Sequence, residues 1–389
     1  MTHDMIMRCA TTLLVFCSCW GTGLEAAAPT VRVAKKQAES VLVSAGAQPQ
    51  EFRYTAFPSL LQTQPDEVWV AYKVGRSHAT DAGAGIEVVR HVLSTGKTTL
   101  LQRMIAPAPE LYQMGELARF PDGAIGLYID VQSVGWDGRH YRAGATSFHW
   151  NGARGAFGGP TQLAPIEGVL YGYPFDFIND GKTTWQLIMA FGYHLPGGRW
   201  SVDAVRSDDN GQSWRFVRNL TEEFGGIRAN ESGFVRHGDG FIVTTRGYDR
   251  IARLHRTDRE FKVRHQSDLT GKYPFINSYV GRPRVFIRDG HGYLIGRNWT
   301  RPNARAGEKS ESPSEMQLCL IRFDPETLAV TSCVILDNAE YERVTDGYYA
   351  VVAFSGEGDS ERMHVFTYKA LKSAPPDIVR FDFRWADVR

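Results

Sequence analysis

The sequence predicts an all-β fold, a six-bladed β-propeller, and three observations support this prediction. From Val31 onward, short runs rich in Val, Ile, Phe, Tyr and Trp are broken by Gly, Asp, Asn or Pro roughly every eight to twelve residues. No long run combines helical periodicity with helix caps. Hairpin turns recur at steps of about fifty to sixty residues, which suits four-stranded blades, and about 350 mature residues then give six of them.

The N-terminal segment, residues 1–28, has the layout of a cleavable signal peptide. Arg8 precedes an apolar run at 9–16, and the small residues 26–28 precede Pro29. The run is too short for a stable membrane helix, and no stop-transfer pattern follows it. We therefore expect a secreted or periplasmic protein without a membrane span. No linker interrupts the remainder, so residues 29–389 are predicted to form a single domain.

Composition narrows the choice of partners and cofactors. The 389-residue chain is 43% hydrophobic and carries a formal net charge of +1, which argues against binding to nucleic acid. His78, His91 and His194 show no metal-ligand spacing, and we expect no metal and no other cofactor. Beyond the leader, Cys319 and Cys333 flank a predicted hairpin, where they form either a cross-strand disulfide or two buried thiols.

One hairpin turn carries a specific motif, Ser-Asp-Asp-Asn-Gly-Gln-Ser-Trp at 207–214. Ser207 and Asp209 can bond turn amides, Gly211 supplies a positive φ, and Trp214 folds back as a hydrophobic plug. This spacing resembles the Asp-box of sialidase-type β-propellers. Weaker copies of the turn lie at 94–98, 151–155, 257–260 and 324–327, and Asp-Gly pairs suited to the inner hairpins lie at 122–123, 180–181, 239–240 and 289–290.

The first blade is similar to the opening of the sialidase family, in which an Arg precedes a Pro-containing strand and an acidic Asp follows on the next loop. Here Arg53 precedes a strand that contains Pro58, and Arg76 and Asp81 follow on a later loop. Pro58 comes several residues later than in the family's usual Arg-Ile-Pro. The resemblance implies that Arg53 and Arg76 bind the substrate and that Asp81 is the acid.

Two later segments resemble the remaining catalytic parts of sialidases. Glu231 enters a predicted strand and Arg246 leaves its hairpin partner, as do the family's catalytic Glu and its second substrate-binding Arg. The segment Thr-Asp-Gly-Tyr-Tyr-Ala-Val at 345–351 resembles the one with the nucleophilic Tyr. Tyr348 fits that position, and Tyr349 is the alternative.

At the position where the family usually has its third substrate-binding Arg, this sequence has no Arg, because Pro-Ser-Glu at 313–315 precedes the strand there. Arg297 ends an inner strand in the same way as Arg246 and is our first candidate, with Arg284 second. The order of the motifs along the chain carries more weight than any one of them. Each residue also has a structural interpretation as an ion-paired rim charge, a turn former or a half-buried aromatic.

The chemistry of an acidic sugar explains why a Tyr, a Glu, an Asp and three Arg residues could together cleave its glycosidic bond. A sialic acid carries a carboxylate on its anomeric carbon, which would repel an anionic nucleophile. Sialidases therefore use Tyr, a weak nucleophile until a base, here Glu231, accepts its proton. Three guanidiniums can hold the carboxylate by forked hydrogen bonds. Asp81 would protonate the leaving oxygen, and the anomeric configuration would be retained.

The resemblance thus implies an exo-acting hydrolase of sialylated or other acidic glycans, and two alternatives stay open. Related propellers include polysaccharide lyases and rhamnosidases that use His and Tyr on acidic glycans, and the missing third Arg favours them. A propeller could also bind glycans without turnover, because one fold hosts many functions.

Overall fold

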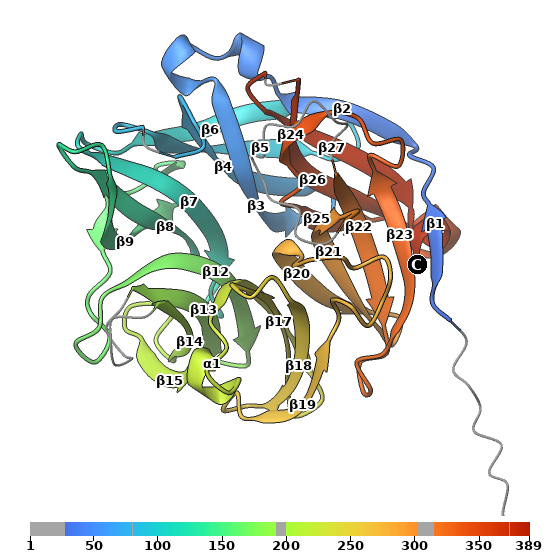
Figure 1. The fold of residues 1–389 in the computed structure, drawn as a ribbon. Helices are drawn as coiled ribbons and strands as arrows, with labels where there is room; N and C mark the ends of the chain where they lie inside the picture. Colours follow the sequence, from blue (N-terminus) through green and yellow to red (C-terminus); the bar gives the residue numbers. More distant parts are fainter. Residues whose placement is uncertain (1–27, 80, 192–199, 302–314, 373) are drawn as a thin grey trace, which may run out of the picture.

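The computed structural model describes residues 28–79, 81–191, 200–301, 315–372 and 374–389, so residues 1–27 of the predicted signal peptide and His194 lie outside the described residues. Six β-sheets are arranged as blades around a central axis (Figure 1). The predicted six-bladed β-propeller is therefore confirmed. No described helix is long and apolar enough to cross a membrane.

The blades follow one another along the chain. Blade 1 contains β3 (Tyr54–Gln64), β4 (Glu67–Gly75), β5 (Gly85–Val92) and β6 (Thr98–Ile105). Blade 2 contains β7 (Glu110–Arg119), β8 (Ile125–Val134), β9 (His140–Asn151), β10 (Ala156–Phe157) and the short β11 (Thr161–Gln162). Blade 3 contains β12 (Tyr171–Asp180), β13 (Thr183–Phe191), β14 (Trp200–Ser207) and β15 (Arg215–Asn219).

The second half repeats this order. Blade 4 contains β16 (Ala229–His237), β17 (Gly240–Gly247), β18 (Ala252–Asp258) and β19 (Val263–Asp268). Blade 5 contains β20 (Gly281–Arg288), β21 (His291–Trp299), β22 (Met316–Phe323), β23 (Val330–Asp337) and β1 (Thr30–Val33). Blade 6 contains β24 (Val344–Gly347), β25 (Val351–Ser355), β26 (Arg362–Leu371), β27 (Asp377–Arg384) and β2 (Ala38–Val43). The short helices are α1 (Leu220–Glu223), α2 (Trp385–Val388), η1 (Ala45–Ala47), η2 (Gln50–Phe52) and η3 (Gly358–Ser360).

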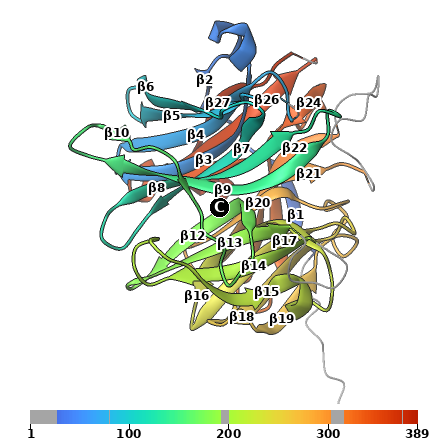
Figure 2. The same cartoon turned by 90° about the vertical axis from the view of Figure 1, so that its left-hand side faces the viewer.

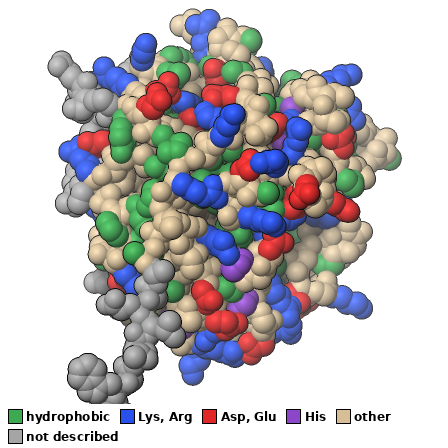
Figure 3. All heavy atoms as spheres, turned by 90° about the vertical axis from the view of Figure 1, so that its right-hand side faces the viewer, with side chains coloured by type: hydrophobic (Ala, Val, Ile, Leu, Met, Phe, Trp, Pro, Cys, Tyr) green, Lys and Arg blue, Asp and Glu red, His purple; other side chains and the backbone are tan. Residues whose placement is uncertain are grey.

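Each blade is covered by a neighbour on both faces, and this explains the continuous apolar runs of the sequence. In β4, every residue from Val68 to Gly75 is buried, as expected of a strand with no solvent-facing side. Blade 2 packs on blade 3, with β8 and β9 against β12 (Figure 2). Figure 3 shows Lys, Arg, Asp and Glu side chains interspersed on the face around β1, which fits the small net charge.

The N-terminal strands close the ring. β2 pairs antiparallel with β27, so that Ala38 lies opposite Asp382 and an early segment supplies the outer strand of the last blade. β1 pairs parallel with β23 of blade 5. Closure of this kind protects strand edges that an open sheet would expose.

The predicted turns occupy equivalent places. The 207–214 turn joins β14 to β15, and the four weaker copies join the third and fourth strands of blades 1, 2, 4 and 5. Ser207 Oγ donates to Asp209 Oδ1 (2.7 Å) and accepts the Gly211 amide (2.8 Å), while Asp209 Oδ1 accepts the Ser213 amide (2.9 Å). Gly211 has φ +80°, and Trp214 is buried.

The two cysteines are free buried thiols, which settles the alternatives that the sequence left open. Cys319 lies opposite Ile335 and Cys333 opposite Ile321. The two cysteines are therefore diagonal neighbours and not a directly facing pair.

Candidate active site

A pocket of about 280 Å³ lies at the central axis, and side chains from all six blades line it. The lining residues are Phe57, His78, Ala79, Gln113, Met114, Gln132, Arg142, Tyr173, Trp200, Asn230, Glu231, Arg246, Tyr248, Arg297 and Tyr349. The inner strands begin here, so that each blade contributes a strand end or the loop beside it. Such convergence on the axis is the usual place for a propeller site.

Glu231 is the buried carboxylate of this pocket. It lies on β16, where Oε2 accepts Arg246 Nη1 (2.6 Å) and the Arg282 amide (2.9 Å), and Oε1 accepts the Tyr173 hydroxyl (3.2 Å). Burial alone would raise its pKa, but the Arg246 charge and hydrogen bonds from Tyr349 and Arg246 lower the pKa of Glu231 to about 2. Glu231 is therefore ionised at every ordinary pH.

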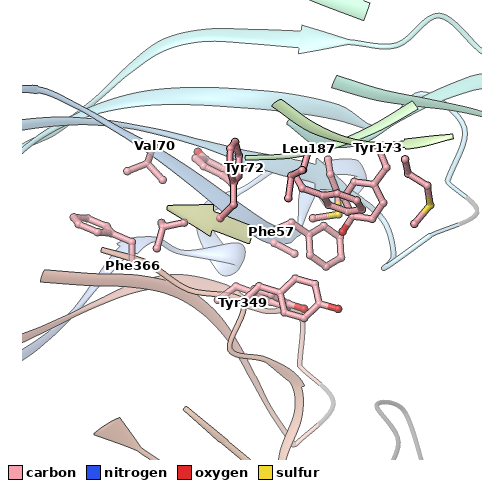
Figure 4. Packing of buried hydrophobic residues seen from close by; sticks show 14 of the residues in the cluster. Phe57, Val70, Tyr72, Tyr173, Leu187, Tyr349 and Phe366 are labelled. Atoms are coloured by element: carbon pink, nitrogen blue, oxygen red, sulfur yellow. The ribbon is translucent and has the colours of Figure 1, made fainter. Parts of the chain in front are cut away.

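Tyr349 lies between the carboxylate and two arginines. Its hydroxyl bonds Glu231 and lies 3.2 Å from Arg246 Nη1. The Arg297 guanidinium carbon is 4.6 Å from the centre of its ring. Phe57 faces the ring at 5.8 Å, with Tyr173 alongside (Figure 4). Burial and then the Glu231 charge raise the pKa of Tyr349 above its ordinary value, and the two arginine charges oppose this rise.

Arg246 and Arg297 provide most of the positive charge around Tyr349. Arg246, at the end of β17, also lies over the ring of Tyr279, 4.1 Å from its centre. Arg297 is almost fully buried on β21 and donates to the Gly347 carbonyl (2.7 Å). A third arginine, Arg142 on β9, reaches the pocket from the opposite side, and its Nη1 donates to a buried carboxylate of β8 (2.7 Å).

A second carboxylate, Asp346, lies behind the pocket wall. Its Oδ1 accepts Arg297 Nη2 (3.0 Å) and the Tyr368 hydroxyl (2.9 Å), and its Oδ2 lies 2.7 Å from His78 Nδ1. Oδ2 also accepts the Tyr54 hydroxyl. Burial would raise the pKa of Asp346, but the His78 hydrogen bond and the Arg297 charge hold it well below its ordinary value.

The structure does not place Tyr348 in the pocket. The Tyr348 side chain is fully buried in the core shared by blades 5 and 6, where its hydroxyl donates to Asp337 Oδ2 (2.8 Å). Tyr348 has φ +68°, which turns the chain between β24 and β25 and directs the following residue to the axis. The alternative residue, Tyr349, is the one that lines the pocket.

Asp81 and Arg76 also lie away from the pocket. Asp81 is buried, with Oδ1 2.8 Å from Lys73 Nζ, and its Oδ2 accepts the amides of Arg76 (2.9 Å) and Ser77 (3.2 Å). The Arg76 side chain is exposed and contacts the Ala82 carbonyl (3.4 Å). Asp81 thus neutralises a buried lysine and fixes the loop; sequence spacing could not show that partner.

Arg53 is exposed, and its hydrogen bond within the described part of the chain goes to a local carbonyl. It follows η2, and its Nε donates to the Gln48 carbonyl at 3.4 Å. In the family's Arg-Ile-Pro order, the Arg position before Pro58 is filled here by Ala56, which is buried. Phe57, at the middle position, has φ +59° and lines the pocket.

Arg284 lies in a separate axial cluster on β20. It donates to Glu116 (2.6 Å) and to the Phe175 carbonyl (2.7 Å) and lies 3.2 Å from Asp176. Arg282 donates to the same Glu116 carboxylate (2.8 Å). Of the two candidates for the third arginine, the structure therefore places Arg297 and not Arg284 in the pocket.

Three residues in or directly behind the pocket were not predicted from the sequence. Asp346 directly precedes the glycine of the tyrosine segment, and no role for it was evident from the sequence. His78 lies in the loop between Arg76 and Asp81; the sequence shows that it has no metal-ligand spacing but not that it faces the pocket. Arg142 carries no sequence signal, because its role depends on the packing of blade 2 against the axis. Among the described residues, no group of three or more His, Cys, Asp or Glu side chains is arranged to hold a metal ion.

No family model and no curated protein matches the chain. Its fold is similar to that of a protein of unknown function from Dyadobacter fermentans, with a TM-score of 0.67 and 13% identity over 90% of this chain and 98% of that one. It is also similar to a mutant of NanB sialidase from Streptococcus pneumoniae, with a TM-score of 0.59 and 11% identity over 90% of this chain and 71% of that one. A Trypanosoma rangeli sialidase mutant that displays trans-sialidase activity has a TM-score of 0.57 and 11% identity over 93% of this chain and 60% of that one. These identities are low, so the likeness concerns the fold: this chain has the six-bladed β-propeller fold that sialidases also have.

Proposed function

We propose that this protein is an exported, exo-acting and retaining glycoside hydrolase that releases terminal sialic acid, or a related acidic sugar, from glycoconjugates. The observation that carries the proposal is the single pocket that brings Tyr349, Glu231, Arg246 and Arg297 together. The sialidase-like fold supports it. Export depends on residues 1–28, of which 1–27 lie outside the described part of the chain, and stays a prediction.

In this proposal Arg246 and Arg297 bind the substrate carboxylate. Both guanidiniums flank Tyr349, which places a bound carboxylate next to the attacking oxygen. A second anion at that place would be repelled, whereas a protonated phenol is not. This is the physical reason to assign attack to Tyr349 and not to a carboxylate.

Substrate binding itself activates the base. In the free protein, Arg246 holds the pKa of Glu231 at about 2, which makes Glu231 a weak base. A substrate carboxylate shares the positive charge of Arg246 and so raises the basicity of Glu231. Glu231 then accepts the Tyr349 proton as the phenol oxygen bonds to the anomeric carbon, and the two arginines stabilise the charge that develops on that oxygen. Water subsequently releases the sugar with retained configuration.

The test is turnover of a fluorogenic aryl sialoside by the purified mature protein, with free sialic acid identified by mass spectrometry. We expect turnover by the parent protein and its near-complete loss in Tyr349→Phe. Saturable binding of sialosides without any product would reject the hydrolase and indicate a glycan-binding propeller.

A polysaccharide lyase is the second candidate, because the pocket contains His78 and Tyr349 whereas the expected acid Asp81 is bound to Lys73. A lyase would release an unsaturated uronate that absorbs in the ultraviolet. Incubation with uronate-containing polysaccharides, followed in the ultraviolet and by mass spectrometry, separates the two activities.

A further inference from the structure

We propose that His78 is the proton donor to the leaving group and that Asp346 positions its ring. The inference rests on the proposed glycosidase function, and it is needed because Asp81, the acid expected from the sequence, faces Lys73 and does not line the pocket. His78 lines the pocket together with Tyr349 and Glu231, and its side chain is 52% exposed at the pocket rim, where a leaving group would depart.

The backbone of the His78 loop is held in place by buried polar groups. Lys73 Nζ donates to the carbonyls of Ser77 and His78, each at 3.1 Å, and Gln113 Nε2 also donates to the His78 carbonyl (2.7 Å). Asp81 accepts two amides of the same loop. The Lys73–Asp81 pair thus has a structural role, to hold the loop that presents His78.

The imidazole ring is oriented by its Nδ1 side. Nδ1 lies 2.7 Å from Asp346 Oδ2 and 2.9 Å from the Tyr54 hydroxyl, and Phe57 packs on the ring edge-to-face at 4.9 Å between centres. Asp346 is ionised because Arg297 and two tyrosine hydroxyls bind it, so it accepts the proton of Nδ1. Nε2 is then the nitrogen that serves the leaving group.

The proton balance of the two steps is complete. In the first step, the imidazolium Nε2–H protonates the glycosidic oxygen as its bond to the anomeric carbon breaks, while Tyr349 forms its bond to that carbon and gives its proton to Glu231. In the second step, neutral Nε2 takes a proton from water, whose oxygen displaces Tyr349, and Glu231 returns the proton to the phenol.

The test is the dependence of turnover on the leaving group. Sialosides with good leaving groups, such as 4-nitrophenol, need little protonation, whereas sialyllactose has a sugar alcohol as its leaving group. We expect His78→Ala to lower kcat/KM for sialyllactose by about 100-fold or more, because a general acid usually accelerates a reaction by at least this factor. For the 4-nitrophenyl substrate, kcat/KM should stay within about fivefold of the parent value.

Matched variants separate the outcomes. His265→Ala removes an exposed histidine of β19 and should change neither substrate's turnover. Asp346→Asn should lower sialyllactose turnover selectively, a pattern that a general loss of packing would not produce. If the melting temperature of His78→Ala shows that this variant does not fold properly, His78→Gln replaces it in the comparison.

Equal losses on both substrates, or no loss on either, would overturn the role of His78 while the glycosidase assignment stands. An absence of turnover of both substrates by the parent protein, in contrast, removes the proposed function and this inference with it.

Discussion

The neighbouring residues Tyr348 and Tyr349 provide the sharpest test of the site, because loss of the hydroxyl should affect stability at one and catalysis at the other. In Tyr348→Phe, the buried Asp337 loses a 2.8 Å hydrogen bond but keeps Lys369 at 2.9 Å. Loss of a hydrogen bond to a charged group costs about 1.5–3 kcal/mol. At about 2 °C per kcal/mol for a chain of this size, the melting temperature should fall by about 3–6 °C.

Turnover, in contrast to stability, should depend on the Tyr349 hydroxyl and not on the Tyr348 hydroxyl. Tyr348→Phe should keep the parent kcat, since its side chain does not reach the pocket. Tyr349→Phe should lower kcat at least about a thousandfold, as loss of a covalent nucleophile does. The assay is aryl sialoside hydrolysis, with melting followed by circular dichroism on the same samples. If Tyr349→Phe retained a tenth of the parent kcat, or if Tyr348→Phe lost activity without loss of stability, the reasoning would be refuted.

Four further predictions address charge, binding, redox state and packing. The pKa of Glu231 falls from 4.5 to about 2 on folding, so Glu231 stabilises the fold above pH 4.5 and this stability is lost as the pH falls toward 2. In acid denaturation, the parent protein should therefore lose about 3 kcal/mol of stability over this range, and Glu231→Gln should not show this loss. Arg246→Lys should raise KM about 10–100-fold, because a lysine cannot make the forked contact, and unchanged KM in steady-state assays would argue against the carboxylate clamp. Cys319 and Cys333 should both react with a thiol reagent after denaturation without reductant, and neither should react in the native protein. Gly211→Ala should lower stability by about 2–4 kcal/mol in thermal melts, because φ is +80° and a Cβ would lie 2.4 Å from an aromatic ring carbon.

The fold could be predicted from the sequence because its determinants are local. The 207–214 turn and its weaker copies mark the same hairpin in successive blades, and strands buried on both faces read as continuous apolar runs. The ring closure by β1 and β2 left no such signal, since pairing between the two ends of a chain depends on the completed ring and not on a local pattern.

The site could be predicted only in part. Glu231, Arg246 and Arg297 lie in the pocket as expected, because each one starts or ends a strand near the axis. The tyrosine differed by one residue, since a left-handed residue at position 348 changes which neighbour faces inward, and a shift of one residue along a strand exchanges its faces.

The proposed acid, His78, could not be predicted, because its placement depends on contacts between distant segments. Asp81 is bound to Lys73 of the preceding strand, and His78 is oriented by Asp346 from blade 6. A motif compared position by position does not contain such pairings.

The pairing of β2 with β27 affects the order of assembly in the cell. A ribosome makes β2 near the start of synthesis and β27 near its end, so the edge that β2 will cover does not exist until synthesis is nearly complete. Contacts of such long sequence separation slow folding, and a chain threaded through an export channel would meet this delay on the far side. Removal of the segment that carries β2 would leave β27 as the unpaired outer edge of blade 6, the kind of surface through which incomplete propellers would pair with one another.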